Sequence, residues 1–222
     1  MAFCIPKKQS EPDPDSTLDY QSIFTIKKCY LINNNSLVLN GQKPLVELRK
    51  MWSNEKTTTF VMVDSIYFNS IPLKITQSPY YTICNSDTIS QNTLPPFIWR
   101  AANLSEFPTF TISISDSIPR LSSYNTLPDS ISASKTSLIY IEGANASDVE
   151  IIIEKSNGEL CWAIYRPINN STAMVYTPNN LAVLNTATLI INFKKGFYKT
   201  IDEKEVFFSL IASYSKQIKI VP

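Results

Sequence analysis

Aromatic side chains are the residues of this chain whose type and spacing best suit a binding site. Four of them lie beside prolines or turn-forming residues, namely Trp52, Tyr80, Tyr81 and Trp99. When a loop presents such rings to solvent, they stack on the C–H faces of sugars. Aromatic rings more often fill a hydrophobic core or a subunit interface. We favour a core or interface position for these rings and keep glycan binding as the alternative.

The stretch Phe97-Ile98-Trp99 follows a pair of prolines and consists of three consecutive apolar residues. Successive side chains of a strand point to opposite faces of a sheet, so these three cannot all reach one core. Either Phe97 with Trp99, or Ile98 alone, is therefore expected to be available to a partner. The candidate interface or ligand-binding residues are Trp52, Tyr80, Tyr81, Phe97, Ile98 and Trp99.

Catalytic side chains have no convincing arrangement in the sequence. The chain contains no His, which excludes His-dependent triads, His general bases and His metal ligands. The serines lack the G-x-S-x-G context of a nucleophile elbow. Glu203 and Glu205 are the acids considered for a glycosidase pair, but the segment around them is typical of a polar turn. We therefore expect no enzyme, no metal site and no cofactor.

Charge and composition exclude further classes of protein. Lys and Arg number 20 and Asp and Glu number 19, so the net charge is +1 and the basic excess of a nucleic-acid-binding protein is missing. With 4 Gly and 14 Pro, the chain cannot form a glycine-rich phosphate loop, and its turns must rely on Asn, Asp, Ser and Pro. The 222 residues are 44% hydrophobic, which is enough for an ordinary core.

The cysteines and the apolar runs bear on where the protein is made. The cysteines, which include no C-x-x-C pair, are Cys4, Cys29, Cys84 and Cys161. We interpret them as free thiols of a protein that folds in a reducing compartment. The first residues lack the apolar core of a signal peptide, and the longest apolar runs are too short for a membrane span. We therefore expect synthesis in a cytoplasm.

The N-terminal half predicts an arm followed by short strands. Residues 1–19 are polar, contain prolines and lack periodicity, which indicates an extended arm. Residues 20–115 contain short runs rich in β-branched and aromatic residues, separated by turns rich in Asn, Ser and Asp. Within 107–115, apolar residues alternate with Thr and Ser, as in a strand with one buried face. We expect residues 20–115 to form a jelly-roll-like β-sandwich.

The C-terminal half predicts a second sandwich. Residues 116–135 lose the alternation, which favours a linker. In 136–222, Asn157-Gly158 between two apolar runs predicts a hairpin with a two-residue turn. That register places Ile153 opposite Trp162 and turns Trp162 toward the core. About seven strands are expected here, with a Trp on the third, and this layout is typical of an immunoglobulin-like β-sandwich.

The sequence thus predicts an all-β protein with two β-sandwich units, an N-terminal jelly-roll-like unit and a C-terminal immunoglobulin-like unit. Without a catalytic set, its function is expected to lie in its surfaces. By analogy with proteins of this class, we expect a structural component of a virion, such as a minor capsid, penton, decoration or tail protein. Its partners would be copies of itself and other structural proteins. The alternative is a carbohydrate- or receptor-binding module or an adhesin, located at a cell surface.

Overall fold

The computed structural model describes residues 20–33, 36–50, 63–77, 81–85, 93–104, 109–168 and 172–222. In these ranges the protein is all-β, with several sheets and no helix, so the predicted class of fold is confirmed. No helix in the described ranges is long and apolar enough to cross a membrane.

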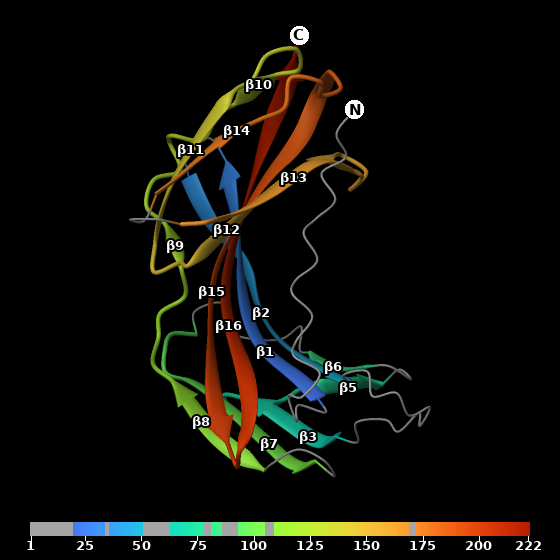
Figure 1. Cartoon of the computed structure of the whole chain (residues 1–222), viewed down its shortest axis with the longest axis vertical. Coiled ribbons are helices and arrows are strands. Elements are labelled where there is room, and N and C mark those ends of the chain that lie inside the picture. Colours follow the sequence, from blue (N-terminus) through green and yellow to red (C-terminus); the bar gives the residue numbers. More distant parts are fainter. Residues whose placement is uncertain are drawn as a thin grey trace.

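Long strands dominate the chain. The strands are β1 (Tyr20–Asn33), β2 (Ser36–Lys50), β3 (Val63–Phe68), β4 (Ile71–Pro72), β5 (Lys74–Gln77), β6 (Tyr81–Asn85), β7 (Phe97–Leu104), β8 (Phe110–Ile114), β9 (Arg120–Leu121), β10 (Ser130–Ser132), β11 (Leu138–Ala144), β12 (Asp148–Lys155), β13 (Leu160–Pro167), β14 (Thr172–Tyr176), β15 (Leu184–Ile201) and β16 (Lys204–Val221). Strands β1, β2, β15 and β16 have 14 to 18 residues each. They pass through both the upper and the lower half of the molecule (Figure 1).

One nine-stranded sheet joins the two halves of the sequence. Its order is β13-β12-β15-β16-β1-β2-β6-β5, and β10 pairs with the end of β16. Strand β1 lies parallel to β16, with ten aligned residues from Ile23 opposite Phe207 to Ile32 opposite Lys216. Two smaller sheets, β4-β3-β7-β8 and β14-β11-β9, complete the described fold. The first strand of the described chain is therefore held by the last.

Two hydrophobic cores lie on the same face of the long sheet. Because side chains alternate along a strand, the even-numbered residues of β1 share one face. Phe24 and Ile26 belong to the lower core, which the sheet β4-β3-β7-β8 covers. Ile32 of the same strand belongs to the upper core, with β11 and β14 of the other small sheet. Each core is thus enclosed by one small sheet and one half of the shared long sheet.

The expected division of the chain differs from this arrangement in two respects. Strands β1 and β2 belong to the expected N-terminal unit, and β15 and β16 to the expected C-terminal unit, yet they are neighbours in one sheet. The segment 116–135, expected as a linker, contains β9 and β10 and buries Leu121, Leu127 and Ile131 in the upper core. These apolar residues reach the core at irregular spacing, so alternation does not identify them. The jelly-roll-like and immunoglobulin-like units stay predictions.

The β12–β13 hairpin has the predicted register but a different turn. Ile153 is opposite Trp162 as expected, and Trp162 packs partly buried against the upper core. The Lys155 N–H donates to Glu159 O, and the Gly158 N–H donates to Lys155 O, so three residues form the loop. Gly158 has φ of 82°, where only glycine is unstrained. Cys161 is an extra residue in β13, and this bulge restores the register that a two-residue turn would have given.

The packing of Gly143 on Phe193 fixes where the upper small sheet lies. A Cβ at Gly143 in β11 would overlap the ring of Phe193 in β15, so β11 crosses directly over β15. The Leu121 N–H of β9 donates to Tyr214 Oη of β16 at 2.9 Å. Burial raises the pKa of Tyr214 to about 12, so the phenol stays neutral and accepts this bond.

We expect Gly143→Ala to lower the free energy of unfolding by about 1–3 kcal/mol, because the added methyl group would overpack the upper core against Phe193. Urea denaturation followed by tryptophan fluorescence measures this change. The control is Glu142→Ala, whose side chain lies on the opposite face of β11 and should change stability by about 0.5 kcal/mol or less. Equal stability of the Gly143 variant and the parent would contradict the stacking of β11 on β15.

Candidate interaction surface

Three of the six predicted site residues can be placed with their side chains. Trp52 and Tyr80 lie outside the described residues. Tyr81 lies in β6, but its side chain is also outside the described part of the chain. The remaining three are consecutive residues of β7, namely Phe97, Ile98 and Trp99.

Strand β7 buries two of these three residues and exposes the third. Phe97 and Trp99 are fully buried in the lower core, whereas Ile98 is 43% exposed. The indole of Trp99 meets Phe24 and Phe68 edge-on, with ring centroids 5.2 and 4.8 Å apart. Aromatic contacts of this geometry stabilise a core beyond the area that they bury. Of the two alternatives, Ile98 is therefore the one that the fold leaves available.

The surroundings of Ile98 are polar. Its N–H donates to Asn69 Oδ1 at 2.7 Å, and its carbonyl accepts from the Asn69 N–H at 2.8 Å. On the same outer face, Arg100 lies over the ring of Tyr67 at 5.8 Å, and Ser113 is opposite Ile98. Single exposed apolar residues are common on protein surfaces and identify no site by themselves. Ile98 alone therefore does not make an interaction surface.

A more apolar surface lies in the upper half, on the outside of β11 and β14. Leu138 is opposite Tyr176, and Tyr140 is opposite Met174. Leu138, Met174 and Tyr176 are 49%, 63% and 64% exposed, respectively. We call these four side chains the β11–β14 face: Leu138, Tyr140, Met174 and Tyr176. The residues between them face inward and build the upper core, so both faces of this strand pair are apolar.

Strand β14 is also an edge strand, because it pairs only with β11 among the described strands. An unpaired edge offers backbone N–H and C=O groups to any extended chain, and proteins usually protect such edges with charges, prolines, bulges or short length. The five residues of β14 are Thr-Ala-Met-Val-Tyr and include no charge and no proline. Its pairing with β11 is regular, without a bulge.

Five other described edges carry protection that β14 lacks. Strand β13 has the Cys161 bulge and ends with Arg166 and Pro167. Strand β5 has four residues and begins with an exposed lysine, Lys74. Strands β4 and β9 have two residues each. Strand β8 is uncharged, but its exposed side chains are Thr111 and Ser113. Among these edges, β14 alone combines a strand without charge, proline or bulge with an apolar outer face.

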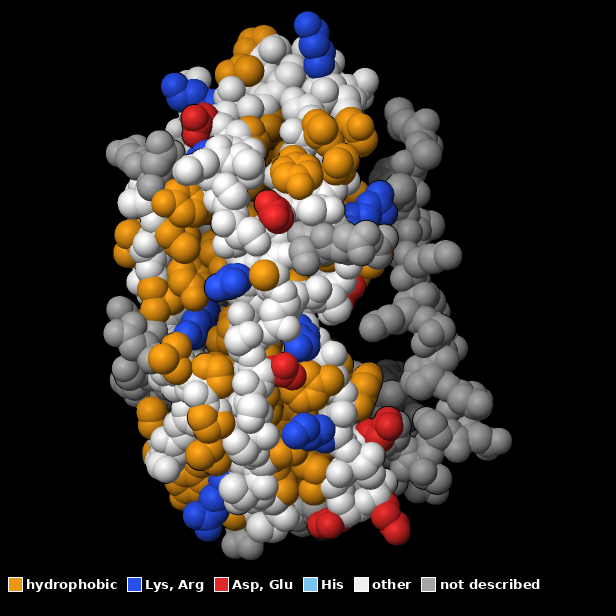
Figure 2. Space-filling model, turned by 90° about the vertical axis from the view of Figure 1, so that its left-hand side faces the viewer, with side chains coloured by type: hydrophobic (Ala, Val, Ile, Leu, Met, Phe, Trp, Pro, Cys, Tyr) orange, Lys and Arg blue, Asp and Glu red, His pale blue; other side chains and the backbone are white. Residues whose placement is uncertain are grey.

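The sequence contained a signal for this surface. Residues 138–141 read Leu-Ile-Tyr-Ile and residues 173–176 read Ala-Met-Val-Tyr, so neither run alternates between apolar and polar. In an antiparallel sheet with one solvated face, alternation is the normal pattern. Continuous apolar strands therefore indicate a second face that is apolar. Figure 2 shows apolar side chains gathered in groups along the side that carries β8, β9 and β11, with charged side chains scattered singly among them.

A polar waist separates the two cores on the same face of the long sheet. Lys28 of β1 is opposite Gln42 of β2, and the two are only 8% and 3% exposed. The Lys28 ammonium donates to Thr93 O at 3.0 Å, and burial lowers the pKa of this lysine. Neither amide atom of Gln42 has a hydrogen-bond partner among the described residues. Burial without hydrogen bonds is costly, so Gln42 is a weak point of the fold.

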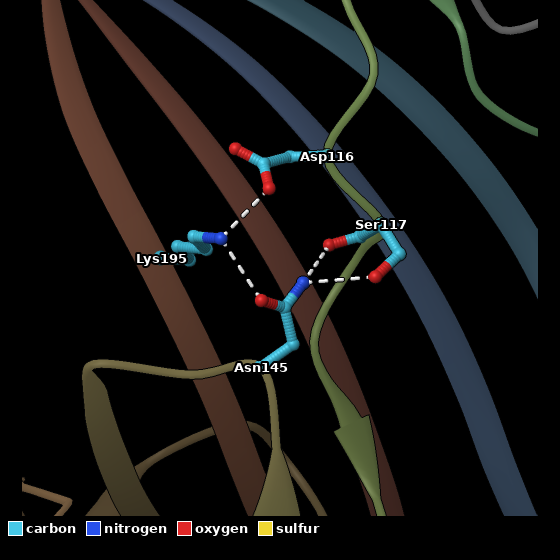
Figure 3. Close-up of polar contacts among 4 residues, drawn as sticks. All are labelled: Asp116, Ser117, Asn145 and Lys195. Atoms are coloured by element: carbon cyan, nitrogen blue, oxygen red, sulfur yellow. Dashed lines mark hydrogen bonds and ion pairs between the residues drawn. The ribbon is translucent and has the colours of Figure 1, made fainter.

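A second set of polar contacts holds the connection between the halves. Lys195 of β15 lies 2.9 Å from Asp116 Oδ1 and donates to Asn145 Oδ1, also at 2.9 Å (Figure 3). The Asn145 amide donates to the carbonyl and to Oγ of Ser117. These contacts attach the segment after β8 to the β11–β12 turn. Because Asp116 is 46% exposed, the ion pair contributes little stability. We interpret the cluster as contacts that fix the position of the segment after β8.

The acids considered for catalysis lie at the lower tip. Glu203 is in the two-residue turn between β15 and β16, with φ of 65°, and Glu205 is exposed at the start of β16. In the described ranges, no group of three or more His, Cys, Asp or Glu could hold a metal ion. Cys29 and Cys161, the cysteines whose side chains are described, are free thiols as expected.

Comparison with known proteins gives no family to which the chain can be assigned. No protein-family model matches the sequence, and no curated protein is significantly similar to it. The β11–β14 face is therefore the best candidate for a functional surface.

The position of β7 predicts opposite effects for two neighbouring residues. Trp99→Ala should lower the free energy of unfolding by about 3–5 kcal/mol, because it leaves a cavity in the lower core. Ile98→Asp should cost about 1 kcal/mol or less, because this side chain lies on the outer face. Denaturant titration of both variants beside the parent measures these values. A loss for Ile98→Asp as large as that for Trp99→Ala would contradict the orientation of β7.

Gln42→Met should keep or raise the stability of the protein, by up to about 2 kcal/mol, because it replaces a buried amide without partners by an apolar chain of similar shape. The same denaturant titration applies. Gln42→Glu is the control and should be destabilising, because it introduces a charge into the buried waist. If the Met variant lost more than about 1 kcal/mol, the Gln42 amide would have to make bonds that stabilise the waist.

Proposed function

We propose that this chain is a structural, non-catalytic component of a larger assembly and that it acts through protein–protein contacts. One observation carries the proposal, namely the exposed apolar β11–β14 face. Exposed apolar area favours association with another protein. Three of the four side chains of the face are about half exposed or more, so they need no rearrangement to make contacts.

The specific form of the proposal is a virion component, such as a minor capsid, penton, decoration or tail protein. This form rests on analogy with β-sandwich proteins that assemble through their surfaces. The small net charge of +1 is compatible with it, because partners would be recognised by apolar area instead of bulk charge. Copies of the chain and other structural proteins are the proposed partners.

Carbohydrate or receptor binding is less well supported. A glycan site needs exposed rings, and the two predicted rings whose side chains are described, Phe97 and Trp99, are buried in the lower core. Exposed tyrosines remain at Tyr165, Tyr176 and Tyr198, but they lie on three different strands, β13, β14 and β15. We therefore keep the assembly function as the proposal.

Sedimentation velocity of the full chain over a wide range of concentrations tests the proposal. We expect the weight-average sedimentation coefficient to rise with concentration, because weak contacts between copies form by mass action. A glycan array on the same preparation serves as the control for the competing function. A chain that stays monomeric at every concentration and binds glycans would overturn the proposal, and self-association without glycan binding would support it.

A further inference from the structure

We propose that the polar waist contains a binding site for a small monovalent anion, such as chloride or formate, between Lys28 of β1 and Gln42 of β2. The inference is independent of the proposed assembly function, because it concerns a buried site and not the outer surface. It rests on two buried polar side chains, a lysine without an acidic partner and a glutamine without hydrogen bonds.

The pairing of β1 with β2 brings the two side chains together. Lys28 lies directly opposite Gln42, and both are buried on the face of the long sheet that carries the two cores. Opposite residues of an antiparallel pair have their Cβ atoms about 4.5–5.5 Å apart. The Lys28 ammonium and the Gln42 amide group therefore reach the same region of the waist.

The positive charge of Lys28 has no acidic partner in the described part of the chain. An ammonium group has three N–H donors. The hydrogen bond that Lys28 makes goes to Thr93 O, at 3.0 Å. The ion pairs between described residues belong to other lysines, namely Lys155, Lys194, Lys195 and Lys216. A buried charge is costly unless an opposite charge compensates it, and an anion beside Lys28 provides that compensation.

Gln42 supplies a second donor at the same place. Its side chain is 3% exposed, yet neither its amide nitrogen nor its amide oxygen has a hydrogen-bond partner among the described residues. A buried amide without partners loses its hydration without compensation. The Lys28 ammonium and the Gln42 Nε2–H group both donate, so the ligand that suits them must accept from both. A halide or a carboxylate does so, whereas the charge of Lys28 repels a metal cation.

Water is the competing occupant of this site. A buried water molecule can accept from Lys28 and Gln42 Nε2 and can also donate to Gln42 Oε1. It leaves the charge of Lys28 without an opposite charge, however, and a monovalent anion does not. The observations therefore favour an anion, and a site that holds water alone is one outcome of the test.

The position of the site favours a small ligand that exchanges with solvent. Strand β6 pairs with β2 only from Leu45 to Arg49, so no described strand pairs with the far side of Gln42. Thr93, whose carbonyl accepts from Lys28, is partly exposed. The ammonium thus lies close to the surface at this part of β2. Side chains as buried as Lys28 and Gln42 suit a ligand of few atoms, and not an acidic peptide.

Protein stability at rising anion concentration tests the site. The full chain is unfolded with urea in sodium formate or sodium chloride, with sodium gluconate added to keep the ionic strength constant. Gluconate screens charges equally but is much larger than formate. For one site, the unfolding equilibrium constant of the parent should fall about tenfold for each tenfold rise in formate or chloride above the dissociation constant.

Two variants connect this dependence to the site. Lys28→Met and Gln42→Met should each bind the anion about tenfold or more weakly, because each removes one donor. Both replace a buried polar side chain by an apolar one of similar length, and circular dichroism confirms that they fold. Lys195→Met is the matched control. Lys195 lies on the same face but already pairs with Asp116, so this variant should keep the anion dependence of the parent.

Heteronuclear NMR of the side-chain amide groups locates the bound anion. The Gln42 amide signal, identified by its loss in Gln42→Met, should shift as formate or chloride is added. Equal stability of the parent in all three salts, without such a shift, would mean that the site holds water alone and would overturn the inference. Anion dependence that persists in both variants would place the anion elsewhere and would overturn it equally. Neither result bears on the assembly function, which the sedimentation experiment tests separately.

Discussion

The parallel pairing of β1 with β16 is the contact on which the rest of the fold depends. It joins Ile23–Ile32 to Phe207–Lys216, from opposite ends of the chain, through ten aligned residues. Without it the long sheet would separate into β13-β12-β15-β16 and β1-β2-β6-β5, and neither core would have a complete floor. Closing so long a loop costs entropy, which only the burial of both cores can offset. The two cores are therefore expected to form together.

The polar waist explains why one sheet carries two cores instead of one. The face that holds Phe24 and Ile26 below and Ile32 above is interrupted by Lys28, which bonds to Thr93 O. Lys195 lies opposite Leu210 on the same face and is held by Asp116 and Asn145. Charged heads of this kind cannot be buried in an apolar core without partners. Each small sheet consequently covers its own half of the long sheet. Residues 116–119 connect the two small sheets at the level of these polar side chains.

Particular residues show how much of this could be predicted from the sequence. Alternation along single strands predicted the all-β class, and the Asn157-Gly158 signal predicted Ile153 opposite Trp162. The sequence predicts that either Ile98 or Trp99 is exposed, but it does not decide between them. The decision depends on which face of β7 packs against Phe24, a residue far away in the sequence. The pairing of β1 with β16 cannot be predicted from a local pattern either. Alternation shows which residues of a strand share a face, but not which strands are neighbours. Aromatic residues beside turns do not identify the β11–β14 face, because its signal in the sequence is the unbroken apolar runs at 138–141 and 173–176.

The protection of strand edges gives a physical reason for placing the functional surface at β14. Aromatic content gives no such reason. The bulge at Cys161, the charge at Lys74 and the polar outer face of β8 each reduce the chance that an edge recruits a foreign strand. A protein that only had to stay apart from its neighbours would need the same protection at β14. Its absence there, together with exposed Met174 and Tyr176, is costly for a chain that works alone. The same feature is useful to a chain that must join others, because the uncharged edge and the apolar β11–β14 face can then act in one contact.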